Sequence, residues 1–272
     1  MLVGVINIVK TNIYHISYTP ESKFSCLHFW GCNIECKGCL CKREIWSSLL
    51  KGHRLDHLTE PPKEIAQPPE RFLDFEEVMQ ILGKLDVEKV RLEGMEPTID
   101  PQYAKLTKAL HDRLGTYNIV ATNLYEMPSF EDTDMVVCGI TAFTDSLHRE
   151  YTGKSNEKIL ENMIKVYQSG IKLHVSPLFI PDYIGADETE RIAKFTASID
   201  KDIPCFIFPY YKAGDNPWRR PTHEEIDEAV GLAKRYLTNV YYYYGDEDLD
   251  FDVVTIFPDA DALEEIRGRR SV

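Results

Sequence analysis

Short apolar runs alternate with segments of helical periodicity along most of this chain, and that alternation limits the folds open to it. The apolar runs predict strands, and the amphipathic segments between them predict helices. The expected strands are 24–30, 87–92, 118–121, 135–140, 172–180 and 204–208, with a further candidate at 240–244. The expected helices are 75–85, 103–114, 158–169, 188–199 and 223–236. The pattern predicts parallel βαβ units in an α/β fold, and a plain doubly wound sheet fits the same rhythm.

The 272 residues suffice for one sizeable hydrophobic core, and the whole chain, 1–272, is expected to form a single domain. The stretch 43–74 interrupts the rhythm, because it carries several charges and four prolines, Pro61, Pro62, Pro68 and Pro69. It is expected to be a long loop with little regular structure, which either covers a site or is a plain surface insertion. Residues 246–272 follow the last expected strand as a C-terminal extension.

The formal net charge of −13 argues against broad nucleic-acid binding, which relies on Lys and Arg side chains to neutralise phosphates. The charge does not exclude local binding of nucleic acid by a basic patch at Arg267, Arg269 and Arg270. The apolar start 1–7 lacks the basic region and cleavage site of a signal peptide, and no stretch reaches the ~20 apolar residues that span a bilayer. A cytoplasmic protein without a membrane partner is therefore expected. Seven cysteines, an odd number, fit a reducing compartment better than a disulfide framework.

Three cysteines, Cys32, Cys36 and Cys39, directly follow the first expected strand at the spacing C-x3-C-x2-C. Iron–sulfur clusters usually take four thiolates, and structural zinc also takes a closed set of four ligands. A triad on a tight loop therefore predicts a cuboidal iron–sulfur cluster with one iron left open for a reacting ligand. The alternative is a zinc knot or a closed electron-transfer cluster that recruits Cys26 or Cys41.

With this triad the chain resembles the radical S-adenosylmethionine (SAM) superfamily, and further segments resemble its branch around the pyruvate formate-lyase activating enzyme. These segments follow the family's order, and they are Glu93-Gly94-Met95-Glu96-Pro97-Thr98, Thr122-Asn123, His148-Arg149-Glu150-Tyr151-Thr152-Gly153, Ile180-Pro181-Asp182-Tyr183 and Pro209-Tyr210-Tyr211-Lys212-Ala213-Gly214. The resemblance implies an open, partial (β/α)6 barrel with a mostly parallel sheet. The active site of such a fold lies at the C-terminal ends of the strands.

The resemblance also implies the cofactors and their contacts. Cys32, Cys36 and Cys39 would bind a 4Fe-4S cluster, whose open iron would bind the amino and carboxylate groups of SAM. Reductive cleavage of SAM, with an electron from a reduced flavodoxin or ferredoxin, would give a 5′-deoxyadenosyl radical that abstracts hydrogen from carbon. The residues expected to contact SAM or to border the cluster are Gly38, Gly94, Met95, Glu96, Thr122, Asn123, Thr141, Ser176 and Tyr211.

Glu96 is expected to accept a hydrogen bond from the SAM ammonium, and Gly94 to let the backbone approach the ligand closely. Other positions depart from the family pattern. The family's Asp-x-Lys falls on Gly139 and Thr141, its arginine on Ser176 and its histidine on Tyr211, while Met95 replaces a glycine and Gly38 an aromatic residue. Two of these changes remove a cation. Either the substituted residues hold SAM through other hydrogen bonds, or the pocket suits a different ligand, and ordinary packing is the third interpretation.

The expected function is hydrogen abstraction by a radical SAM enzyme, and the resemblance favours activation of a partner protein through a glycyl radical. Modification of a small molecule or a peptide is the second hypothesis. A non-catalytic iron–sulfur or zinc protein on the same barrel is the third.

A six-stranded arc leaves a lateral gap that the loop 43–74 and the loop 212–221, with Trp218, Arg219 and Arg220, could line. Aromatic and arginine residues suit protein contacts, so a protein or peptide substrate is expected there, unless Trp218 simply packs beneath its own loop.

Overall fold

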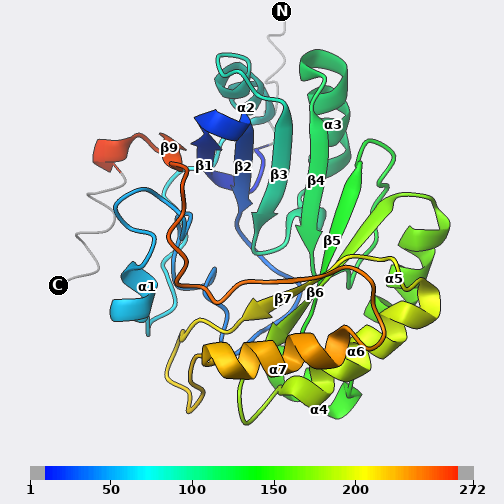
Figure 1. Ribbon diagram of the computed structural model, residues 1–272. Helices are drawn as coiled ribbons and strands as arrows, with labels where there is room; N and C mark the ends of the chain where they lie inside the picture. The colour runs from blue at the N-terminus through cyan, green and yellow to red at the C-terminus, as the bar shows by residue number, and fades with distance from the viewer. Residues whose placement is uncertain (1–9, 263–272) are drawn as a thin grey trace, which may run out of the picture.

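The computed structural model describes residues 10–262, which form one nine-stranded sheet with helices along its outer side (Figure 1). The strands are β1 (Ile13–Thr19), β2 (Phe24–Phe29), β3 (Lys89–Gly94), β4 (Tyr117–Thr122), β5 (Met135–Ile140), β6 (Lys172–Phe179), β7 (Cys205–Pro209), β8 (Val240–Tyr242) and β9 (Val254–Phe257). The helices are α1 (Asp56–Thr59), α2 (Phe75–Leu82), α3 (Tyr103–Ala109), α4 (Asp145–Thr152), α5 (Glu157–Gln168), α6 (Ala186–Ile199) and α7 (His223–Ala233). A π-helical turn, Leu110–Leu114, continues α3.

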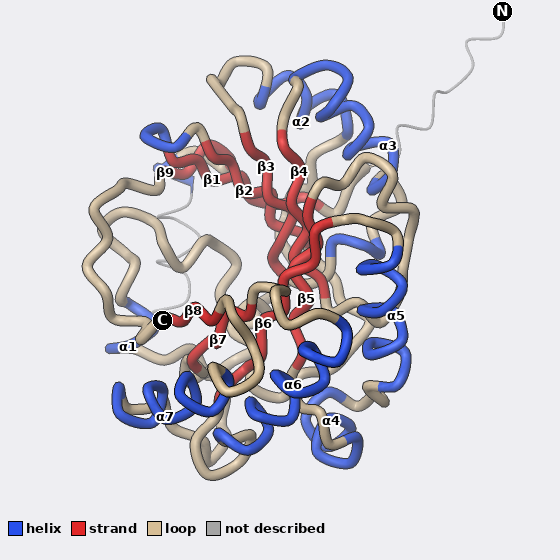
Figure 2. Tube along the Cα trace, turned by 45° about the vertical axis from the view of Figure 1, so that its right-hand side comes forward, coloured by secondary structure: helices blue, strands red, loops and turns tan. Residues whose placement is uncertain are grey.

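The strands from β2 to β8 lie side by side, parallel and in chain order. β1 pairs antiparallel with β2 and carries β9, also antiparallel, on its other edge. Within the described residues β8 and β9 form the two edges of the sheet, which follows an open arc with loops on its open side (Figure 2). The α/β class, the mostly parallel sheet and the partial barrel predicted from the sequence are confirmed.

The outer face of the sheet is buried because apolar side chains alternate with polar or small ones along the central strands. Leu92, Val120, Val136 and Val175 are fully buried in one core together with side chains of α2, α3 and α5. Burial of a side chain of this size stabilises a fold by roughly 1.5–3 kcal/mol. The residues between them point to the opposite, inner face. Gly139 lies on that face and is exposed.

The sequence does not predict β1, β9 or α4. All of β1 is buried, because Ile13 and Ile16 join the outer core while Tyr14 packs with Ile45 and Ala66 of the stretch 43–74. The alternation of apolar and polar residues over 14–19 was the signal that could have revealed β1. A register shift between Ile13 and His15 in the pairing with β2 interrupts that alternation at the start of the strand.

The stretch 43–74 spans the open side of the arc and contacts both of its edges. The Lys51 N–H donates to the Val253 carbonyl at 2.9 Å, next to β9, and the Gly214 N–H, after β7, donates to the Pro62 carbonyl at 2.8 Å. Arg54 forms an ion pair of 2.7 Å with Asp248. Apart from the four-residue α1, the stretch consists mainly of turns and loops, as predicted.

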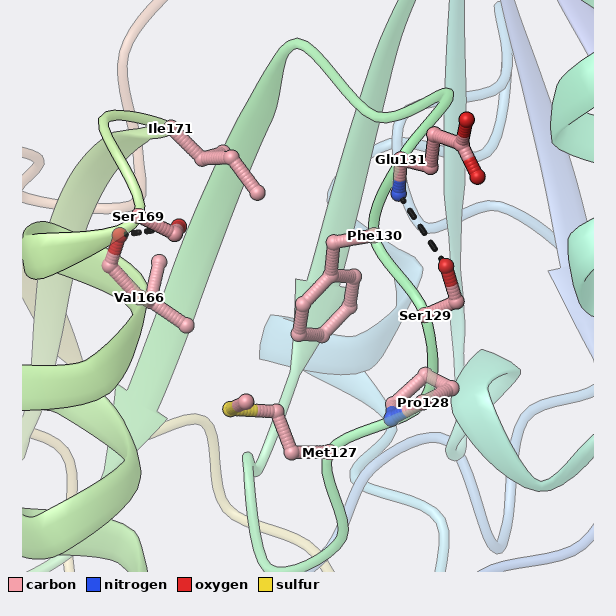
Figure 3. A pocket seen from close by; sticks show the side chains of 8 residues that line it. All are labelled: Met127, Pro128, Ser129, Phe130, Glu131, Val166, Ser169 and Ile171. Carbon is pink, nitrogen blue, oxygen red and sulfur yellow. Dashed lines mark hydrogen bonds between the residues drawn. The ribbon is translucent and has the colours of Figure 1, made fainter.

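The connection from β4 to β5 is a loop, 123–134, that returns along the outer face of the sheet without a helix. A cavity of about 420 Å³ lies between this loop and the end of α5, and it is lined by Met127, Pro128, Ser129, Phe130, Glu131, Val166, Ser169 and Ile171 (Figure 3). Phe130 and Val166 belong to the outer core, so the cavity lies on the helical side of the sheet. None of its lining residues belongs to the expected site.

Some expectations lie outside the described residues. They are the apolar start 1–7, the basic patch at Arg267, Arg269 and Arg270, and the part of the C-terminal extension beyond residue 262. Between residues 10 and 262, no helix is both long enough and apolar enough to cross a membrane.

Candidate active site

The cysteine loop begins where β2 ends, and the C-terminal end of α4 anchors it. The Glu35 N–H donates to the Thr152 carbonyl at 2.8 Å, and the Lys37 N–H donates to the Tyr151 carbonyl at 3.1 Å. The last carbonyls of a helix have no partner within the helix, so a neighbouring loop can supply the donors. The segment 148–153, picked out by its family resemblance, therefore supports the cysteine loop.

Gly38 provides space inside this loop. A Cβ atom at this position would lie 2.7 Å from the Tyr210 ring and 2.9 Å from the Tyr151 hydroxyl. Both tyrosines are almost completely buried, and Cys36 packs against the same cluster. The aromatic residue that the family places before its last cysteine is thus absent where two aromatic rings from other elements already fill the space. Packing thus explains the glycine at this position, and the expectation that Gly38 borders the cofactor stays a prediction.

The thiols of the loop differ in their electrostatic surroundings. Cys41 is close enough to donate its S–H to Cys39, which lowers the pKa of Cys39 to about 6. Burial raises the pKa of Cys32 to about 11 and raises that of Cys36 further. The Lys42 ammonium, which also donates to the Ile34 carbonyl at 3.1 Å, favours the thiolate form of all three triad cysteines. A bound metal would be needed to hold Cys36 as a thiolate near neutral pH.

The donor set fits a cuboidal cluster better than a single ion. A zinc knot needs four ligands around one ion, whereas each thiolate of a cuboidal cluster binds a different iron. Cys26 lies within β2 rather than in the loop, where burial and the nearby Glu93 raise the pKa of its thiol.

Glu96 is the centre of a hydrogen-bond network at the ends of β3 and β4. Its Oε1 accepts from the Thr98 hydroxyl at 2.6 Å, the Thr98 N–H at 3.1 Å and the Thr122 hydroxyl at 2.7 Å. Its Oε2 accepts from the Asn123 N–H at 2.8 Å. The side chain has no exposed surface, and burial raises its pKa although the hydrogen bonds oppose that rise. These contacts are all internal, so the carboxylate holds the strand ends together instead of facing an open pocket.

Asn123 connects this network to the cysteine loop. Its Nδ2 lies 3.6 Å from the Sγ of Cys32 and 2.8 Å from the Oδ1 of Asn33. Its own Oδ1 accepts from the Tyr125 N–H at 2.8 Å. The structure therefore brings together Glu96, Asn123 and Cys32, three of the residues expected from the sequence. Asn33 was not expected, because a contact across 90 residues leaves no local pattern.

Gly94 and Met95 pack against the end of β2. Gly94 has a φ of +103°, and a Cβ there would lie 2.8 Å from the Phe29 nitrogen. The close approach that this glycine permits is therefore to Phe29 and not to an open space. The sulfur of Met95 accepts from the Gly31 N–H at 3.2 Å, so the residue that replaces a glycine ties β3 to the start of the cysteine loop.

Thr141, Ser176 and Tyr211 lie in or just after the strands that follow, and none of them is a hydrogen-bond partner of Glu96 among the described residues. Ser176, in β6, faces the inner side and donates to the Phe206 carbonyl at 3.1 Å. Thr141 directly follows β5 and is buried. Tyr211 follows β7, and its ring packs edge-on against His57 of the stretch 43–74 at 4.6 Å. Burial raises the pKa of Tyr211 to about 12.

The sequence analysis did not identify a cluster of charged residues on the inner face of the sheet. Arg91 and Glu93 of β3 pair there, with 2.8 Å between Nε and Oε2, and His28 of β2 lies 3.8 Å from Glu93. Burial, followed by the charge of Arg91, lowers the pKa of His28 to about 3, so its ring is neutral. Polar residues that alternate with the buried Val90 and Leu92 were the signal that could have revealed this group.

Trp218, expected to line the lateral gap, packs against aromatic rings outside its own loop. Its ring stacks on Tyr183 at 4.5 Å and lies 5.3 Å from Tyr151 and 6.1 Å from Tyr210. Arg219 pairs with Glu225 at 2.6 Å. These side chains make internal contacts, so they do not by themselves support a docking surface.

Comparison with known proteins gives a family and a similar fold. Residues 27–196 match the family model of the radical SAM superfamily. A Methanocaldococcus jannaschii protein, provisionally named a glycyl-radical enzyme activating enzyme, is 27% identical over 248 residues, which cover 88% of each chain. The pyruvate formate-lyase 1-activating enzyme of Escherichia coli is 21% identical over 119 residues, 39% of this chain and 48% of that one. The fold is similar to QueE from Escherichia coli, with a TM-score of 0.51 and 14% identity over 86% of this chain and 93% of that one.

Proposed function

This chain belongs to the radical SAM superfamily, and from that premise we propose that Cys32, Cys36 and Cys39 bind a 4Fe-4S cluster whose open iron takes SAM. The chain is an enzyme. The cofactors would supply one-electron cleavage of SAM and, from it, a carbon radical that abstracts hydrogen. The observation that carries the proposal is the triad itself, on a loop that α4 anchors and that Asn123 connects to the buried Glu96.

The protein's own residues would hold the reactants in place. Glu96 is assigned a positioning role, because its carboxylate is occupied by Thr98, Thr122 and Asn123. It would thus act on SAM binding through the strand ends rather than through the SAM ammonium. The remaining candidates for contact with SAM are Met95, Thr141, Ser176 and Tyr211.

We propose that the substrate is a partner protein, which the enzyme activates by forming a glycyl radical. The similarity over 88% of both chains to a relative named for that activity supports this assignment. Electrons would come from a reduced flavodoxin- or ferredoxin-type protein, because each turnover needs one low-potential electron. A protein substrate would have to enter on the open side of the arc, beside the stretch 43–74.

Modification of a small molecule is the second candidate, and one observation favours it. The Arg91–Glu93 pair faces the inner side of the sheet, with side chains 35% and 26% exposed. The Arg91 Nε is buried and lies 2.8 Å from the Glu93 Oε2, close enough for an ion pair. The angle between the two groups does not make this contact a hydrogen bond. Such a pair suits a small zwitterionic substrate inside the barrel better than a protein surface.

The test is anaerobic reconstitution with iron and sulfide, followed by iron analysis and absorption spectroscopy. The wild type should be brown, with about four irons per chain. Replacement of Cys32, Cys36 or Cys39 by Ala should abolish the cluster, since each of these thiolates would bind a different iron. Cys41→Ala is the matched control, a thiol of the same loop outside the triad, and it should keep the colour. Cluster loss in Cys41→Ala together with survival in Cys39→Ala would refute the ligand assignment.

A further inference from the structure

Asn123 presents a hydrogen-bond donor to Cys32. Its Nδ2 lies 3.6 Å from Cys32 Sγ and 2.8 Å from Asn33 Oδ1, while its Oδ1 accepts from the Tyr125 N–H at 2.8 Å. A backbone N–H can only donate, so the contact with Tyr125 identifies the oxygen of the amide. The NH2 group must then be the end that faces Cys32.

The orientation of this donor is set by residues outside the cysteine loop. The Asn123 N–H donates to Glu96 Oε2 at 2.8 Å, and the Thr122 hydroxyl donates to Glu96 Oε1 at 2.7 Å. Glu96 is completely buried, and hydrogen bonds to a carboxylate are stronger in such surroundings. The turn that carries Asn123 is therefore fixed against the cysteine loop by the end of β3.

A donor in this place would act on the electron affinity of a cluster. Hydrogen bonds to ligand sulfurs are among the factors that set cluster reduction potentials. Reduction adds one electron from a low-potential donor, with no bond made or broken, and leaves the thiolates more negative. An N–H donor stabilises the reduced state more than the oxidised state, because the sulfur carries more negative charge after reduction.

We propose that Asn123 is a positioning residue that raises the reduction potential of the cluster through an N–H···S hydrogen bond to Cys32. The inference rests on the proposed function, in which Cys32 is a cluster ligand. It adds a role for the Thr122-Asn123 turn that differs from contact with SAM. Glu96, by holding this turn, would act on the same potential.

The test is a redox titration of the reconstituted full-length protein without SAM. Titanium(III) citrate serves as the reductant, and the electron paramagnetic resonance signal of the reduced cluster is the readout. Asn123→Ala removes the donor without adding charge, and Asn123→Asp keeps an acceptor for the Tyr125 N–H while adding a negative charge. The equilibrium constant for reduction should fall several-fold in the Ala variant and further in the Asp variant. A tenfold fall corresponds to a midpoint about 59 mV more negative for a one-electron couple.

Asn118→Ala is the matched control. Asn118 is also a buried amide, and it lies near the start of β4, the strand that Asn123 follows. Its Nδ2 donates to the Thr107 and Asp132 carbonyls, both at 2.9 Å, and not to a cysteine. Its midpoint should equal that of the wild type even if the variant is less stable. A variant that binds less iron still gives a reduction midpoint, since the titration measures only the clusters that are present.

Midpoints of both Asn123 variants equal to the wild-type value would overturn this inference and leave the proposed function intact. A fall of the same size in Asn118→Ala would also overturn it, because the effect would then be a general result of lost stability. A wild-type protein that assembles no cluster would overturn the proposed function as well.

Discussion

At the scale of single residues, the site depends on glycines that leave room for neighbouring groups and on a carboxylate whose two oxygens both accept hydrogen bonds within the protein. Gly38 leaves room for the Tyr151 and Tyr210 rings, and Gly94 lets β3 lie against the Phe29 backbone. The Glu96 carboxylate accepts hydrogen bonds from Thr122 and Asn123 at the end of the neighbouring strand. These residues shape the site without facing an open pocket.

Gly38→Ala should destabilise the cysteine loop. The added Cβ would lie 2.7 Å from the Tyr210 ring and 2.9 Å from the Tyr151 hydroxyl, so the loop or the rings must shift. Overpacking of this kind costs about 1–3 kcal/mol. Iron content after reconstitution and the midpoint of thermal unfolding measure the effect. Gly231→Ala is the control, because Gly231 lies inside α7 with open space around it and should gain about 0.5–1 kcal/mol. Normal iron content in Gly38→Ala would contradict the packing explanation.

At the scale of elements, strand ends are held by groups that come from elsewhere in the chain. The end of α4 supplies carbonyls to the cysteine loop, and the buried Glu188 at the start of α6 accepts from the Phe143 and Thr144 N–H groups at 2.7 and 2.8 Å. On the inner face, His28 of β2 lies among Ser17 and His15 of β1 and Arg91 and Glu93 of β3. Helices and neighbouring strands thus fix the loops at the site.

The buried His28 should make stability depend on pH. Burial, and then Arg91, lowers its pKa from 6.5 to about 3. The folded state therefore keeps the ring neutral, while the unfolded state binds a proton below pH 6.5. Stability is fully present above that pH and is lost as the pH falls towards 3, with a slope of about 1.4 kcal/mol per pH unit for one histidine.

Urea unfolding at several pH values between 6.5 and 4.5 tests this expectation. His28→Gln removes the titrating ring, so the slope of its unfolding free energy with pH should be smaller than that of the wild type. Asn118→Ala is the control, because it removes a buried side chain that does not titrate and should keep the wild-type slope. Equal slopes in the wild type and His28→Gln would show that His28 is not buried as a neutral ring.

At the scale of the whole molecule, an open arc of strands is completed on one side by the stretch 43–74 and the loop after β7. These segments meet at the hydrogen bond between Gly214 and Pro62. Trp218 extends the contact inwards, because its ring lies against Tyr183, Tyr151 and Tyr210. Tyr151 and Tyr210 also lie against Gly38, so the loop after β7 supports the cysteine loop through these two rings.

Trp218→Ala should therefore reduce cluster content and not merely substrate binding. Loss of a large buried aromatic ring costs about 3–5 kcal/mol, and the half-buried Trp218 should lose less. Iron per chain and uncoupled formation of 5′-deoxyadenosine should fall together. Arg219→Ala, in the same loop but exposed, should change neither. If Trp218→Ala kept its iron and its uncoupled rate but lost activity on a protein substrate, the ring would be a docking residue after all.

The sequence predicts those features that depend on local patterns. The strands from β2 to β8 and the helices α2, α3, α5, α6 and α7 follow from hydrophobic periodicity, and the cysteine triad follows from spacing. The missed β1 does alternate apolar and polar residues over 14–19, but the irregularity between Ile13 and His15, with Ile13 and Ile16 both in the outer core, depends on the pairing with β2. The pairing of Asn123 with Asn33, and the two tyrosines over Gly38, join residues far apart in the chain. Such contacts depend on the folded arrangement, and no single stretch of sequence encodes them.

The central claim is that the triad holds a cluster that cleaves SAM. The most direct measurement is the formation of 5′-deoxyadenosine after the reconstituted protein is reduced in the presence of SAM. The account predicts this product from the wild type and its absence from Cys36→Ala prepared in the same way. A wild type that carries a reducible cluster with full iron content, yet forms no 5′-deoxyadenosine under any reducing condition, would contradict the account.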